Sequence, residues 1–270
     1  MADVADDLQV YRRLVGARIR SDWQYRTSFV LFLLSQSVVA GLDLAVIVVL
    51  FSRVNAIAGW SVTEVALLYG VAGLSFGIAD LLVSQVEIAS QHIKAGTFDL
   101  FLLRPVGALL QLCAMEFALR RVGRSVQPAI VLVVALANAH INWTPDKVAL
   151  LPIAVISSVF IWGSIWVLTS SLSFWTIETQ EVSNSFTYGG QTLSHYPIDV
   201  LGTWLRHFVV FVVPLAFTSY LPVAYLLDKP RSFDLPRGLA LASPVVAAVL
   251  VLAACAVWRL AVRHYRSTGS

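Results

Sequence analysis

Residues 148–177 form a run of thirty positions without a single Asp, Glu, Lys or Arg. About 20 apolar residues are enough to cross a hydrocarbon core of roughly 30 Å, so this run can span a membrane with residues to spare. The whole chain of 270 residues is 58% hydrophobic and only 13% charged. Soluble domains carry about 25% charged residues, so the sequence predicts an integral membrane protein.

Further charge-poor blocks predict an all-α integral membrane protein with six transmembrane helices in a single domain, residues 1–270. The predicted spans are 27–51, 62–86, 122–141, 148–176, 204–227 and 239–260, the last being the C-terminal span. The fifth is interrupted by Pro214 and Pro222, and proline removes a backbone donor and bends or breaks a helix. That region is therefore either one crossing, two short helices, or a hairpin that dips in from outside.

Basic residues predict the orientation, because Lys and Arg that flank membrane spans are retained in the cytoplasm. One set of span ends holds Arg12, Arg13, Arg18, Arg20, Arg26, Lys94, Arg104, Arg120, Arg121, Arg124, Arg206, Arg259, Arg263 and Arg266. The other set holds Arg53, Lys147, Lys229, Arg231 and Arg237. Fourteen against five places both termini in the cytoplasm, and it also makes the polar segment 178–202 a cytoplasmic connection between spans four and five.

Residues 1–26 predict an amphipathic helix in the cytoplasmic interface, because apolar side chains recur at helical spacing on one side. The apolar stripe consists of Leu8, Tyr11, Val15 and Ile19. The expected anchors, which meet anionic head groups or the membrane boundary, are Arg12, Arg13, Arg20 and Trp23. An ordinary cytoplasmic lead-in helix is the alternative.

The connection between spans two and three, residues 87–121, is rich in apolar side chains that need something to bury them. Gly96 is expected to end one helix, and Pro105 to open the next, because its missing N–H is unneeded in a first turn. Between them lie Phe98, Asp99, Leu100, Phe101, Leu102, Leu103 and Arg104. Apolar anchors with charged residues at the rim are typical of a protein docking surface. The alternative, that these residues pack under the protein's own helices, fits the composition equally well.

Four strings in order and spacing along nearly the whole chain carry a family resemblance. They are RIRSDWQYRTSF at 18–29, GTFDLFLLRP at 96–105, HYP at 195–197 and VVPLAFTSYLP at 212–222. With them the chain resembles the membrane permeases of the ABC type 2 exporter class, in particular a bacterial six-span subfamily. The resemblance implies a bacterial cytoplasmic membrane protein that exports a hydrophobic or amphipathic substrate by alternating access.

The resemblance also implies two separate cytoplasmic ATPase subunits and a second permease, identical or related. It places a coupling helix within residues 94–104, and the implied ATPase-coupling residues are Lys94, Phe98, Asp99, Phe101, Leu102 and Arg104. The chain itself lacks the spacing Gly-x-x-x-x-Gly-Lys-Ser/Thr that cradles phosphates, since no Lys follows a glycine. ATP and Mg²⁺ are therefore expected in the partner subunits.

Two carboxylates lie inside predicted spans, where a charge costs roughly 2.5–3.5 kcal/mol at the centre. Asp43 is a candidate for the translocation pathway, and hydrogen bonding to a neighbouring helix is the alternative. Asp80 stands near the cytoplasmic end of span two and is interpreted as interfacial or bonded to a neighbouring helix. Gly70, Gly73 and Gly77 give the same span a small-residue face on which another helix can pack closely.

Other classes of function are weaker. A net charge of +3 is too small to indicate nucleic acid. His195 has no Cys or second His at ligand spacing, so no metal site is expected. Cys113 and Cys255 are expected to be buried thiols instead of a disulfide. A membrane-embedded lipid-modifying enzyme, and a scaffold or receptor subunit that moves nothing, are the alternatives to a permease.

Overall fold

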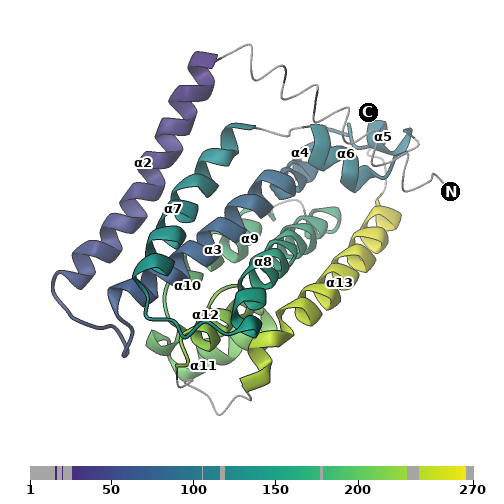
Figure 1. The fold of residues 1–270 in the computed structure, drawn as a ribbon. Helices are drawn as coiled ribbons and strands as arrows, with labels where there is room; N and C mark the ends of the chain where they lie inside the picture. Colours follow the sequence, from purple (N-terminus) through teal and green to yellow (C-terminus); the bar gives the residue numbers. More distant parts are fainter. Residues whose placement is uncertain are drawn as a thin grey trace.

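The structure is a computed structural model that describes residues 16, 20, 26–104, 106–115, 119–176, 179–229 and 237–265. Its described elements are helices, which confirms the all-α prediction for this part of the chain. The long ones are α2 (Arg26–Phe51), α3 (Val62–Leu82), α7 (Gly123–Asn138), α8 (Pro145–Ser171) and α13 (Ser243–His264). They lie side by side, in the spatial order α2, α7, α3, α8, α13 (Figure 1).

Four helical segments of the described residues are long and apolar enough to span a membrane, namely Leu34–Phe51, Val62–Leu82, Pro145–Phe174 and Gly238–His264. The fifth predicted span is instead a bent pair, Thr203–Val212 and Leu215–Leu226, with 73° between the two parts. The third, α7, has only 16 residues. The structure thus supports an integral membrane protein with four candidate spans, or five if the bent pair is one, and does not confirm six.

Helices α3 and α7 pack backbone to backbone at the predicted small-residue face. A Cβ atom added to Gly70 would lie 2.7 Å from the Cβ of Leu132, and one added to Gly77 would lie 2.5 Å from the Oγ of Ser125. Real side chains do not approach so closely, so only glycine permits this spacing. The small-residue face is confirmed as a packing face within the subunit.

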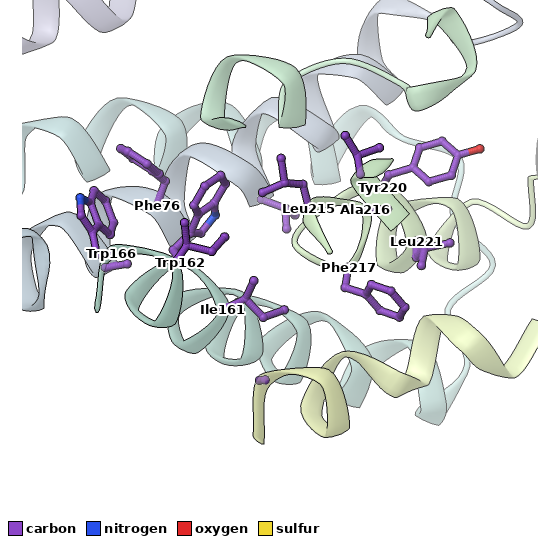
Figure 2. Close-up of a cluster of buried hydrophobic side chains, with 14 of the residues drawn as sticks. Phe76, Ile161, Trp162, Trp166, Leu215, Ala216, Phe217, Tyr220 and Leu221 are labelled. Atoms are coloured by element: carbon purple, nitrogen blue, oxygen red, sulfur yellow. The ribbon is translucent and has the colours of Figure 1, made fainter. Parts of the chain in front are cut away.

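Aromatic side chains fill the space between α3 and α8. Phe76 of α3 packs edge-on against Trp162, with ring centroids 5.1 Å apart, and also contacts Trp166 at 4.8 Å (Figure 2). Serines on α8 mostly bond to their own helix, as Ser157 does to the carbonyl oxygen of Ile153. They satisfy their hydroxyl groups locally and leave the aromatic residues to hold the two helices together.

The connection between α3 and α7 folds into short helices at one end of the bundle (Figure 1). These are η1 (Ser84–Ile88), α4 (Ala89–Lys94), α5 (Asp99–Leu102), α6 (Ala108–Met115) and η2 (Leu119–Val122). We call this end the basic end, defined by Arg104, Arg121, Arg124, Arg259 and Arg263. The opposite end, defined by Trp60, Asp199 and Asp228, is the hairpin end.

The prediction that segment 178–202 is a connection at the basic end is wrong for its described part. After η3 (Leu172–Phe174) the chain forms α9 (Gln180–Asn184), the π-helical η4 (Ser185–Gly189), α10 (Gly190–Ser194) and η5 (Ile198–Val200). Ser183 bonds to Thr169 near the end of α8 at 2.9 Å, while Asp199 accepts a hydrogen bond from the Trp60 indole at 2.7 Å. Residues 180–199 therefore run along the bundle from one end to the other.

The bent pair forms a hairpin. Its first half runs into the helix bundle from the hairpin end, and its second half runs back to the same end. It consists of α11 (Thr203–His207), η6 (Phe208–Val212), η7 (Leu215–Phe217) and α12 (Tyr220–Leu226). Leu215 at its tip lies against Gly190, whereas Asp228 just beyond α12 pairs with Lys147 at 2.6 Å at the start of α8. Of the three alternatives for this proline-interrupted region, the contacts support the hairpin. A turn of 3₁₀ helix, η8 (Arg237–Ala242), then leads into α13.

Because of this hairpin, one basic residue lies at the opposite end of the bundle from the end that the sequence predicted. Arg206 donates hydrogen bonds to the carbonyl oxygens of Leu201 and Asp199, and Asp199 lies at the hairpin end. The expectation that Arg206 belongs with the basic set is therefore wrong. With it moved, the two sets hold thirteen and six basic residues in place of fourteen and five.

Candidate functional site

The candidate site is the predicted coupling segment, residues 94–104, at the basic end. Gly96 has a φ of +67°, a left-handed conformation that glycine adopts at no steric cost. The N–H groups of Gly96 and Thr97 donate to the carbonyl oxygens of Ile93 and His92, which is the Schellman pattern that terminates a helix. The predicted helix break at Gly96 is confirmed, and it turns the chain into α5.

Phe98 and Phe101 are core residues of this end, since their exposed fractions are 0% and 4%. The Phe98 ring packs against Phe174 after α8 and against Tyr265 after α13, with centroids 5.1 and 5.0 Å apart. The sequence left open whether these two side chains dock a partner or pack under the protein's own helices, and the structure shows that they pack under the protein's own helices. Phe98 and Phe101 are therefore too buried to contact a partner directly. Phe98 fixes the segment to the ends of α8 and α13, and Phe101 packs against Phe98.

The outward face of the segment is apolar with basic neighbours. Leu100 and Leu103 expose 59% and 82% of their area, and Leu102 is exposed as well. Lys94 and Arg104 are exposed beside them, while Asp99 is half-buried. The segment thus divides its side chains between an inward aromatic anchor and an outward patch, which we define as Lys94, Leu100, Leu102, Leu103 and Arg104.

A buried amide holds the turn that follows the patch. The side-chain nitrogen of Gln111 on α6 donates to the carbonyl oxygens of Phe101 and Val106, at 2.9 and 2.5 Å. These bonds satisfy backbone acceptors in a segment that has no regular partner of its own. The patch is consequently presented on a braced turn.

Beneath the segment, a charged network links α3 to the start of α7. Asp80 is only 1% exposed and accepts hydrogen bonds from Arg121 at 2.9 Å and Arg124 at 3.1 Å. Arg121 also donates to the hydroxyl of Ser84. A carboxylate at this depth needs such partners, since an unpaired buried charge is costly. The interpretation of Asp80 as bonded to a neighbouring element is supported, because the ion pairs join it to η2 and α7.

Glu87 extends the network to α8. Its carboxylate accepts a hydrogen bond from the indole of Trp166 at 2.5 Å. Burial raises the pKa of the Glu87 carboxyl above its ordinary value, while the Trp166 hydrogen bond and the two arginines act in the opposite direction. Arg124 in turn lies over the ring of Tyr188, 5.4 Å from its centroid.

The sequence interpretation did not single out Glu87, Arg121, Arg124 or Tyr188 as site residues. One signal was available, because a carboxylate within an apolar helix demands a cation, and Arg121 and Arg124 are the nearest basic pair after the connection. Nothing in the spacing indicated Tyr188, which reaches the network only because residues 180–199 run along the bundle.

The remaining predicted site residues are only partly placed. Asp43 lies within α2, but its side chain is outside the described part of the structure, as are Arg12, Arg13 and Trp23. Arg20 is described and exposed. Pathway lining by Asp43 and interfacial anchoring by the four N-terminal residues stay predictions.

A comparison with protein-family models matches residues 37–269, more than half of the chain, to the family described as ABC-2 family transporter protein. No curated protein and no solved structure matches the chain.

Proposed function

The chain belongs to the ABC-2 family of transporter proteins, and from this premise we propose that it is the permease subunit of an ABC exporter. It moves a hydrophobic or amphipathic substrate by alternating access, and separate cytoplasmic ATPase subunits bind ATP and Mg²⁺. The family indicates a transport subunit instead of an enzyme.

The observation that carries this proposal is the outward patch at the basic end. Leu100 and Leu103 are exposed apolar side chains on a turn braced by Gln111 and by the buried ring of Phe98. Apolar anchors surrounded by charged residues, here Lys94 and Arg104, are the composition of a docking site for another protein. We assign the ATPase contact to this patch, with Phe98 and Phe101 as its internal support.

The contacts of the segment provide a route for motion from the ATPases into the membrane helices. Phe98 touches residues at the ends of α8 and α13, and Glu87 bonds to Trp166 within α8. A displacement of the patch therefore acts on both helices at once. Nucleotide binding would shift the permease between two states by as much as the ATPase dimer engages those states differently.

The exposed surface of helix α2 supports the proposal that a second permease is a partner. Among the described residues its main neighbour is α7, and in its candidate span only 6% of the residues are buried. The exposed side chains along it include Val38, Leu42, Val46 and Val49. Two permeases, identical or related, would enclose the pathway, with Asp43 on α2 as the candidate residue lining it.

The basic end is proposed to be cytoplasmic, because thirteen basic residues lie in its set against six in the other. In this arrangement residues 180–199 form the fifth crossing and residues 203–226 a re-entrant hairpin from outside. Non-helical backbone at membrane depth, as at Pro214, is tolerated where protein covers it.

The proposal is tested by co-purification of the tagged chain with the ATPase encoded beside it. Leu100→Asp with Leu103→Asp should abolish recovery of the ATPase and of vanadate-sensitive ATP hydrolysis. The matched control is Val54→Asp, an exposed valine between α2 and α3 at the other end, which should retain both. Undiminished association of the Leu100→Asp/Leu103→Asp variant would move the docking site elsewhere.

A scaffold or receptor subunit would also bind a partner through this patch. The two functions differ in one measurement, because only a permease transmits substrate binding to its ATPase. Candidate amphipathic compounds should raise ATP hydrolysis by the purified complex. An ATPase rate that no compound changes, in a complex that remains intact, would favour the scaffold.

A further inference from the structure

A cavity of about 510 Å³ lies at the basic end, between the connection and the last turns of α13. Seven residues from Phe101 to Leu109 line one side, and five residues of α13 from Cys255 to Arg263 line the other. The apolar part of the lining includes Phe101, Leu102, Leu109, Trp258 and Val262. Its volume falls in the range of roughly 300–1,000 Å³ in which proteins bind small ligands.

Three arginines are among the residues that line this cavity. Arg104 comes from the connection, and Arg259 and Arg263 come from α13, four positions apart and so on one face of the helix. No Asp or Glu is among the described lining residues, and none of the three arginines forms an ion pair with another described residue. Like charges four apart on a helix repel each other, so the cavity is electrostatically suited to an anion.

The helix that supplies the arginines on one side of the cavity also exposes apolar side chains. Helix α13 is a candidate membrane span of which only 22% is buried. Val249, Leu252 and Leu260 on it are exposed. The last turn of such a span lies at the level of the lipid head groups, where arginines between helices bind anionic lipids.

From this juxtaposition we propose that the cavity binds one phospholipid with an anionic head group. Its phosphate accepts hydrogen bonds from Arg259 and Arg263, with Arg104 on the facing wall, and an acyl chain lies against Trp258 and Val262. A free anion would account for the arginines but not for the apolar walls. The site requires that α13 crosses a membrane. It shares Leu102 and Arg104 with the outward patch, whereas Arg259 and Arg263 line the cavity alone.

Cys255 lines the cavity and reports its occupancy. Alkylation of Cys255 by N-ethylmaleimide is followed by peptide mass spectrometry on the full chain in detergent, with buried Cys113 as internal reference. Dioleoylphosphatidylglycerol at ten times its dissociation constant should slow alkylation about tenfold. Dioleoylphosphatidylcholine and inorganic phosphate should leave the rate unchanged.

Arg259→Gln with Arg263→Gln should weaken this protection by on the order of tenfold, since each arginine contributes about 1 kcal/mol near an anionic surface. Arg104→Gln, on the facing wall, is a second variant should the first misfold. Arg53→Gln, an exposed arginine at the hairpin end, is the matched control and should retain full protection.

Four results would overturn the proposal. Equal protection by phosphatidylcholine would show that charge is not recognised, and protection by inorganic phosphate alone would show that no lipid is required. Protection that persists in both arginine variants would place the lipid elsewhere. Protection by the purified ATPase in place of lipid would identify the cavity as part of the protein interface. Loss of ATPase association, by contrast, would affect only the proposed function.

Discussion

The carboxylate of Asp80, on the last turn of α3, accepts a hydrogen bond from the guanidinium of Arg121 at 2.9 Å. This bond joins α3 to the end of the connection that leads into α7. Arg124 adds a second bond to the same carboxylate. The network is therefore the place where the connection and the bundle are held in one arrangement.

Asp80→Asn should lower the free energy of unfolding by about 2 kcal/mol, because it leaves two half-buried guanidinium groups without their counter-ion. The measurement is the midpoint of thermal unfolding in detergent, followed by size-exclusion chromatography. Asp146→Asn, at an exposed carboxylate at the start of α8, is the control and should change the midpoint little. Equal midpoints for the wild type and Asp80→Asn would show that the ion pairs contribute nothing.

Phe98→Ala and Leu103→Ala should differ in their effect on the free energy of unfolding, because Phe98 belongs to the inward anchor and Leu103 to the outward patch. The first removes a fully buried ring and should cost about 3–5 kcal/mol, whereas the second changes an exposed side chain and should stay within about 0.5 kcal/mol. Thermal unfolding of the two purified variants provides the comparison. A destabilised Leu103→Ala, or an unaffected Phe98→Ala, would contradict the division between inward anchor and outward patch.

Glu87→Gln should stabilise the protein at neutral pH. The folded protein raises the pKa of Glu87 above its ordinary value of 4.5, so it binds the proton more tightly than the unfolded chain does. Stability of the wild type therefore falls as pH rises from about 4.5 through the raised pKa. Gln keeps an oxygen for the Trp166 indole but has no proton to lose.

Thermal midpoints measured across that pH window check this prediction. The advantage of Glu87→Gln should be largest near neutral pH and should shrink on acidification toward pH 4.5. A constant difference would mean that folding does not shift the pKa of Glu87, and one that grows on acidification would mean that the carboxylate is better stabilised when charged. Glu181→Gln, at an exposed residue of α9, is the control.

Gly70→Ala should push α3 and α7 apart, since the new methyl group would lie 2.7 Å from the Cβ of Leu132. Overpacking of this kind costs about 1–3 kcal/mol. Gly202→Ala is the matched control, because nothing lies within 4 Å of its added Cβ. If both variants unfold at the wild-type temperature in detergent, the close contact between the two helices is not present.

The course of residues 180–199 can be tested by single cysteines on a background without Cys113 and Cys255. Val54→Cys and Val200→Cys should react with an impermeant maleimide from outside, and Leu103→Cys only after the membrane is opened. Each native side chain at these positions is exposed. Labelling of Val200→Cys from the same side as Leu103→Cys would return the segment to the cytoplasm and refute the crossing.

Several features of the fold could be predicted without coordinates because they depend on local chemistry. Hydropathy and length identified α2, α3, α8 and α13, and the left-handed preference of glycine identified the break at Gly96. The small residues of α3 indicated a packing face. Each of these is a property of one continuous segment of the chain.

The course of residues 180–199 could not be predicted in this way, because their polarity resembles that of a loop. In the structure Ser183 bonds to Thr169, and Thr187 bonds to the carbonyl oxygen of Ser183. These bonds satisfy hydroxyl groups that would otherwise require water. Average hydropathy does not register them, so the segment was predicted to be a connection at one end of the bundle.

The sequence by itself determined that this chain enters a membrane and that most of its helices are apolar. Only the tertiary structure decided that Phe98 faces inward while Leu103 faces outward, and that Arg121 neutralises Asp80. The physical reason is that transfer into lipid is a sum over the residues of one segment. Burial and ion pairing depend instead on which distant segments meet, and those contacts exist only once the chain has folded.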